Sequence, residues 1–133
     1  MALPYAQRTA RAYQRTRVET ARPAQLILML YDGAIRFLSV AHDSFGTREI
    51  EARHTNIVKA QRILSELLAW IDRDGNPSLA DNLVGLYVYM YNRLIDANVE
   101  DTAGPVEEVI GMLRELRSAW AEVDQMQPAA AAA

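Results

Sequence analysis

The chain has 133 residues, with 17 acidic and 14 basic side chains for a formal net charge of −3, and it contains no cysteine. A chain of this length most often folds as one domain with a modest hydrophobic core. The lack of cysteine excludes disulfides and thiol chemistry, which suits a cytosolic protein. No apolar run approaches the roughly 18 residues of a membrane span, and no secretory signal is visible. We therefore expect a cytosolic location without direct membrane insertion.

Charge separates a basic N-terminal segment from an acidic remainder. Residues 1–22 hold five arginines against one glutamate, a balance of +4, whereas residues 23–133 carry −7. Because opposite charges attract, the basic segment is expected to lie against the rest of the chain. The acidic remainder would repel a phosphate backbone, so nucleic acid is not expected as a partner.

Turn signals and apolar spacing predict two helices in the first half of the chain. The first begins near Pro23, a residue favoured in first turns, and runs to about Phe45. Gly46 then breaks the chain, and Thr47 is the expected N-cap of the second helix. The predicted core faces of the two helices consist of Leu26, Ile27, Leu30, Ala34, Phe37, Leu38 and Ala41, and of Ile50, Ile57, Ala60, Leu64, Leu67, Leu68 and Ile71.

Two further helices are predicted in the second half. Residues 72–77, DRDGNP, have the composition of a turn, and Ser78 is the expected N-cap of the third helix, with Asp81 as a loose capping-box partner. Residues 101–105, DTAGP, separate the third helix from the fourth. The core face of the fourth helix is expected to contain Val106, Val109, Ile110, Leu113, Leu116 and Trp120.

The predicted fold is all-α. No segment has the pattern of a strand, and the short connections make consecutive helices antiparallel. We expect an antiparallel up-down-up-down four-helix bundle of residues 22–125, with residues 1–21 as an N-terminal arm or short cap helix and residues 126–133 as a flexible tail. Tyr5, Tyr13 and Val18 are expected to dock the arm by apolar contact.

The third helix carries two apolar stripes where a core needs only one. Its predicted core stripe is Leu79, Leu83, Leu86, Met90, Leu94 and Ala97. A second stripe lies roughly 120° further round the helix. It consists of Val84, Val88, Tyr91 and Ile95, with Tyr87 between the two stripes.

Other helices add to this apolar surplus. Ile63 and Trp70 lie on the flank of the second helix, and Met112 borders the core face of the fourth. Each residue alone is explained by shielding a seam between helices, but a bundle of this size cannot bury two faces of every helix. The surplus therefore predicts a partner, bound by Ile63, Trp70, Val84, Tyr87, Val88, Tyr91, Ile95 and Met112.

No motif for catalysis, metal binding or a cofactor is found. His42 and His54 belong to no metal-binding helix motif, and the chain lacks a phosphate-binding glycine loop. Histidine phosphotransfer bundles place lysine and glycine three and four residues after the working histidine, whereas Ile57 and Val58 follow His54. We expect no enzyme activity, no metal and no cofactor.

Residues 18–38, VETARPAQLILMLYDGAIRFL, resemble the opening of the flagellin secretion chaperone (FliS) family. The similarity continues in order through all four predicted helices and covers about residues 11–123. It includes NIVKAQ at 56–61, the Asn82 to Asn98 segment of the third helix, and VEEVIG at 106–111 with Leu113, Leu116, Arg117 and Trp120.

This resemblance implies a cytosolic chaperone that binds the disordered C-terminal segment of flagellin. Binding would prevent premature polymerisation and deliver flagellin to the cytoplasmic domain of the flagellar export gate. The family's N-terminal segment covers part of the binding surface as a lid, and Tyr13 and Val18 match its apolar positions. Two residues depart from the family pattern, Ala12 in place of asparagine and Arg22 in place of serine. The alternative from the residues alone is a structural bundle that dimerises through its second stripes.

Overall fold

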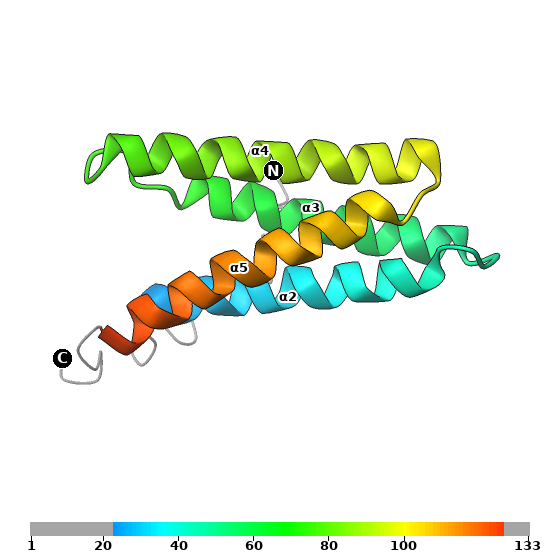
Figure 1. The fold of residues 1–133 in the computed structure, drawn as a ribbon, viewed down its shortest axis with the longest axis horizontal. Coiled ribbons are helices and arrows are strands. Elements are labelled where there is room, and N and C mark those ends of the chain that lie inside the picture. The colour runs from blue at the N-terminus through cyan, green and yellow to red at the C-terminus, as the bar shows by residue number, and fades with distance from the viewer. Residues whose placement is uncertain (1–22, 127–133) are drawn as a thin grey trace, which may run out of the picture.

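The computed structural model of this chain describes residues 23–126. This range contains four α-helices and no strand: α2 (Pro23–Ser44), α3 (Ile50–Ala69), α4 (Pro77–Glu100) and α5 (Gly104–Met126). Consecutive helices run in opposite directions (Figure 1). The predicted up-down-up-down four-helix bundle is confirmed. The predicted arm and most of the tail, with Tyr13 and Val18, lie outside the described residues.

The helices do not pack at a uniform angle. The fourth helix, α5, starts close to the C-terminal end of α4 and crosses obliquely to finish beside the start of α2 (Figure 1). As a result α4 and α5 diverge toward the end of the bundle where α2 begins. A side-chain pocket, described below, lies at this diverging end.

One hydrophobic core joins all four helices. On α2 the fully buried residues are Tyr31, Ala34, Leu38 and Ala41. Partners from the other helices are Ile57, Ala60, Leu64 and Leu67, then Met90, Leu94 and Ala97, and finally Val106, Val109 and Leu113. Apart from Tyr31, these residues were predicted from helical spacing, because each helix has one face on which apolar residues recur every three or four positions.

By length and composition alone, α2 is apolar enough to cross a membrane, over residues Ala24–Ser44. The sequence-based statement that no segment approaches a span was therefore too strong. The apolar character of α2 has a role inside the bundle, because its fully buried face belongs to the common core.

The start of α3 differs from the prediction. Gly46 adopts a positive φ of 79° just after α2, and Thr47 belongs to this turn. The Thr47 hydroxyl donates to the Ser44 carbonyl oxygen at 2.7 Å and accepts from the Glu49 backbone N–H at 3.0 Å. Glu49 precedes the first residue of α3, so Thr47 stabilises the turn and does not cap the helix. Instead α3 begins at Ile50 after Glu49, which makes no side-chain cap bond. Ile50, predicted in the core, is exposed because it lies at the first position of the helix, next to the turn.

The N-cap of α4 is Asn76, and the prediction of Ser78 was wrong. The Asn76 side-chain oxygen accepts from the Leu79 backbone N–H at 3.2 Å. Pro77 occupies the first turn of the helix, where its missing N–H costs nothing, so the cap must precede it. Asp81 does not complete a capping box, and its carboxylate instead lies 3.4 Å from the Arg73 guanidinium.

The buried face of α4 is rotated relative to the predicted one. Leu79 and Leu86, both expected in the core, are exposed, whereas Ala80 and Tyr87 are buried. Met90, Leu94 and Ala97 are fully buried as predicted. This rotation brings the large Tyr87 ring into the centre of the bundle.

Candidate partner-binding surface

An apolar row remains accessible on α4 after the core is filled. We call Val84, Val88, Tyr91 and Ile95 the α4 stripe. Val88 is 42% exposed and Ile95 is 43% exposed. Val84 and Tyr91 are partly buried, and Tyr91 packs against the core. Val99, which sequence reasoning missed, continues the row one turn beyond Ile95 and is exposed.

Contacts on the two sides of α4 place the α4 stripe beside α3. On one flank, Arg93 Nε donates to Glu108 of α5 at 2.8 Å. On the other flank, the Gln61 amide of α3 donates to the Tyr91 carbonyl oxygen at 3.3 Å. The stripe and Arg93 lie on opposite flanks of the helix, so the stripe runs along the outside of the α3–α4 contact.

Two predicted binding residues are buried: Tyr87, which was placed between the two stripes of α4, and Ile63, which was placed on the flank of α3. Tyr87 is 2% exposed, and its hydroxyl lies 2.5 Å from the Tyr31 hydroxyl across the bundle. Ile63 is 6% exposed. Its Cδ1 lies 3.3 Å from the place that a β-carbon on Gly33 would occupy, so the missing side chain of that glycine makes room for it against α2.

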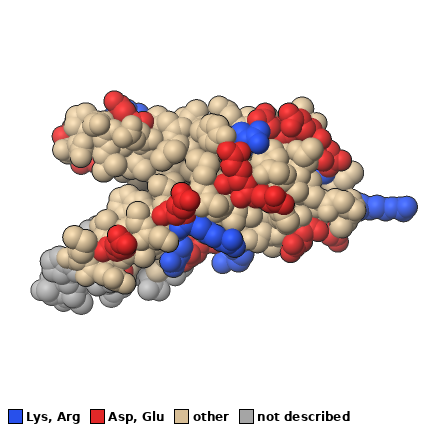
Figure 2. All heavy atoms as spheres, viewed as in Figure 1, with Lys and Arg blue, Asp and Glu red and all other residues tan. Residues whose placement is uncertain are grey.

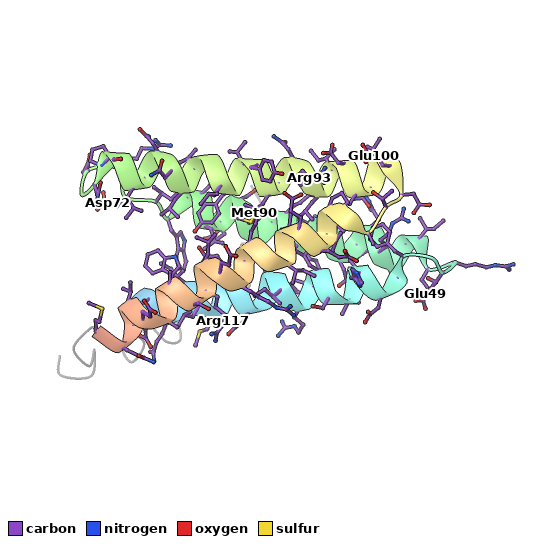
Figure 3. The ribbon with its side chains drawn as sticks, viewed as in Figure 1. Glu49, Asp72, Met90, Arg93, Glu100 and Arg117 are labelled. Atoms are coloured by element: carbon purple, nitrogen blue, oxygen red, sulfur yellow. The ribbon has the colours of Figure 1, made fainter. Side chains whose placement is uncertain are left out.

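A pocket of about 230 Å³ opens at the diverging end of the bundle. We call it the end pocket. Figure 2 shows the molecule hollowed at this end, and Asp72, one of the lining residues, is labelled beside it in Figure 3. The remaining lining residues come from all four helices and the turn before α4: Ile27, Leu67, Trp70, Ile71, Asn76, Leu79, Ala80, Leu83, Tyr87 and Trp120.

The end pocket unites two of the predicted binding residues, Trp70 and Tyr87. The Trp70 indole N–H donates to the buried Glu66 carboxylate at 2.8 Å, which fixes the ring at the C-terminal end of α3. Met112 does not line this pocket; it is partly buried on α5 and packs against the core. Leu79 and Trp120 were assigned to the core from sequence, and only the divergence of α4 and α5 places them at a pocket.

A hydrogen-bonded tyrosine pair lies beside the end pocket. Burial raises the pKa of Tyr31, and hydrogen bonding from Tyr87 and the Trp120 indole acts in the opposite direction. Burial also raises the pKa of Tyr87 far above its ordinary value, with Tyr31 adding to the rise. Both phenols are therefore neutral at physiological pH.

Titratable side chains form pairs between helices. His42 Nε2 lies 2.8 Å from a Glu107 carboxylate oxygen and joins the end of α2 to the start of α5. His54 is exposed. Among residues 23–126, no group of three or more histidine, aspartate and glutamate side chains is arranged to hold a metal ion.

Comparison with known proteins assigns the family. A family model described as "Flagellar protein FliS" matches residues 5–127, a range that contains the whole described bundle. The chain belongs to the FliS family. The resemblance noted from the sequence is thereby confirmed.

Relatives in the FliS family cover most of the chain. The flagellar secretion chaperone FliS of Bacillus subtilis (strain 168) is 36% identical over 116 residues, which span 87% of this chain and 86% of the relative. The protein of the same name from Salmonella typhimurium is 36% identical, over 85% of this chain and 87% of the relative. The flagellar secretion chaperone FliSB of Pseudomonas aeruginosa is 32% identical, over 87% and 95%. These relatives are named as chaperones and not as enzymes.

Proposed function

We propose that this FliS family member is a cytosolic export chaperone for flagellin. It binds the disordered C-terminal segment of flagellin, prevents premature polymerisation and delivers the subunit to the cytoplasmic domain of the flagellar export gate. The observation that supports this proposal most directly is the exposure of Val88 and Ile95 beside a core that is already filled. The names of the relatives supply the link to flagellar secretion.

The α4 stripe has the form expected of a docking surface for an amphipathic helix. Apolar residues that recur every three or four positions match the spacing of apolar residues on such a partner. Complete burial of one large apolar side chain contributes about 1.5–3 kcal/mol. A disordered client must also be ordered, and this cost offsets part of the gain. Moderate affinity of this kind suits a chaperone that later releases its client.

Within this proposal, the predicted binding residues have different roles. Val84, Val88, Tyr91 and Ile95 contact the client directly, and Trp70 contacts it at the end pocket. Tyr87 and Ile63 do not contact the client, because they are buried in the bundle; they support the binding surface by packing inside it. Met112 belongs to the packing of α5 and is the weakest member of the predicted set. Tyr13 and Val18 of the arm act as a lid.

The proposal predicts that Val88→Asp abolishes binding of the flagellin C-terminal segment, because a carboxylate would have to be buried against apolar client residues. Val40→Asp is a matched control, since Val40 is 46% exposed, close to the 42% of Val88, but lies on α2. Titration calorimetry with that flagellin segment should give wild-type affinity for the control. Thermal melts by circular dichroism should show both variants folded.

Normal binding by Val88→Asp would contradict the placement of the site on α4. Equal loss in both variants would point to a general effect of added charge. Sedimentation velocity of the free protein tests the alternative function. A stable dimer that ignores flagellin would support the homodimerising bundle and contradict the export chaperone.

A further inference from the structure

Gln61 is a buried amide at the contact between α3 and α4. Its side chain is 9% exposed, and its nitrogen donates to the Tyr91 carbonyl oxygen at 3.3 Å. Tyr91 lies within α4, so the same carbonyl oxygen is also the helical acceptor for the Ile95 backbone N–H. Gln61 therefore crosses the contact and binds the backbone of the neighbouring helix.

Packing at this position does not require an amide. The neighbouring residues Ala60 and Leu64 on the inner face of α3 are fully buried and apolar. Burial of an amide costs free energy, and its hydrogen bond offsets only part of that cost. Methionine is apolar, flexible and similar in size to glutamine, so it would fill the same space without this cost. The best-attested role of a buried polar group between helices is to fix their register.

The amide of Gln61 holds the helix that packs least on its neighbours. Within residues 23–126, α4 packs less extensively on other helices than α2, α3 or α5 does. On the opposite flank of α4, Tyr89 and Arg93 hydrogen-bond to Glu108 of α5. Residues 89–93 span little more than one helical turn. Two polar contacts therefore hold the same turn of α4 from opposite sides, and rotation of α4 about its axis must stretch one of them.

The turn held by these contacts is the middle of the α4 stripe, because Tyr91 lies between Val88 and Ile95 in that row. A rotation of α4 at Tyr91 would turn the whole stripe relative to α3. We propose that Gln61 is a positioning residue of the binding site: by holding the Tyr91 carbonyl oxygen, it fixes the rotation of α4 and the direction in which the α4 stripe faces the flagellin segment. This inference rests on the proposed function.

A matched pair of variants tests this role. Gln61→Met removes the hydrogen bond to α4 and keeps the size of the side chain. Asn56→Leu is the control, because the Asn56 amide also donates to a backbone carbonyl oxygen, at 2.8 Å, but to Ala52 of its own helix. Titration calorimetry of the full chain with the flagellin C-terminal segment should show affinity about 3- to 10-fold weaker for Gln61→Met, and within about twofold of wild type for Asn56→Leu. Thermal melts should show Gln61→Met at least as stable as wild type.

A double-mutant cycle separates positioning from general stability. If Gln61 acts through the α4 stripe, Gln61→Met should cost less affinity in a Val88→Ala background than in wild type, because a truncated stripe gains less from its correct orientation. Additive effects, unchanged affinity of Gln61→Met, or a lower melting temperature of this variant would each overturn the positioning role and leave the proposed function standing. Absence of binding by the wild-type chain would overturn both.

Discussion

Arg53 is a charged side chain buried at the end of the bundle opposite the end pocket. Its guanidinium lies over the Phe45 ring, 4.9 Å from the ring centre, and forms an ion pair with Asp101. Phe45 follows α2 and Asp101 follows α4, so one side chain of α3 holds both turns at this end. The Arg53 Nε is buried without a hydrogen-bond partner among the described residues. The ion pair with Asp101 is therefore the main interaction that offsets the cost of removing the Arg53 guanidinium from water.

Asp101→Asn should destabilise the protein by about 1–2 kcal/mol, because the buried guanidinium loses its anionic partner while Asp101 itself is largely exposed. Asparagine tolerates the left-handed backbone of this position, where φ is 54°, so the change isolates the charge. Asp81→Asn is the control, since its pair with Arg73 is exposed on both sides. For the control, urea unfolding should show a loss of less than about 0.5 kcal/mol in the free energy of unfolding. Equal effects would contradict the role of Arg53.

At the scale of elements, a polar network joins α4 to α5 where they lie close together. The Tyr89 hydroxyl donates to Glu108 at 2.5 Å, and Arg93, labelled in Figure 3, donates to the other carboxylate oxygen at 2.8 Å. These hydrogen bonds, that of Tyr89 first, hold the pKa of Glu108 below its ordinary value of 4.5. The ionised carboxylate is therefore the form that stabilises the contact.

This pKa shift predicts a stability difference that depends on pH. A lowered folded-state pKa contributes stability that is complete above the ordinary value of 4.5 and is lost as the pH falls through the folded value. Glu108→Gln should therefore be less stable than wild type at neutral pH, and the difference should shrink in acid. Urea midpoints from pH ~7 to ~3 measure this convergence. Glu115→Gln is the control, because Glu115 is exposed on the same helix. A stability difference between wild type and Glu108→Gln that stays constant with pH would contradict the stabilising role of the ionised Glu108 carboxylate.

At the scale of the whole molecule, charge is distributed unevenly along the chain. Residues 1–22 carry +4 and residues 23–133 carry −7. Attraction between such segments falls with ionic strength, because the Debye length shortens from about 10 Å at 0.1 M salt to about 3 Å at 1 M. If the arm covers the binding surface, charge attraction helps to keep it there and competes with the client.

If the arm covers the binding surface, deletion of residues 1–18 should leave flagellin binding intact or strengthen it, because the arm no longer competes with the client. The affinity of the full chain should approach that of the truncated chain as salt is raised, since screening weakens the hold of the arm. Titration of both chains at two salt concentrations measures this. A clear loss of affinity on truncation would reject the lid and make the arm part of the site.

The local sequence determined where the helices lie, because the residues that begin, end and favour a helix act over only a few positions. Pro23 at the start of α2, the turn composition of residues 72–77 and the one-face apolar spacing of α5 each work within one or two helical turns. The surplus stripe on α4 was visible for the same reason, and the structure leaves Val88 and Ile95 exposed. The predicted N-caps Thr47 and Ser78 each lie two residues from the observed N-caps Glu49 and Asn76. Threonine and serine are favoured cap residues, but the geometry of the turn decides which position caps the helix.

Only the tertiary structure decided how the helices rotate against one another and where they diverge. Periodicity gives the direction of a side chain around its own helix, but not the angle at which that helix meets its neighbours. Tyr87 became a core residue because it pairs with Tyr31, 56 positions away, and Ile63 because it packs where Gly33 has no side chain. The oblique path of α5 opened the end pocket. The sequence thus determined which residues are apolar on each helix, and packing between distant segments determined which of them a partner can reach.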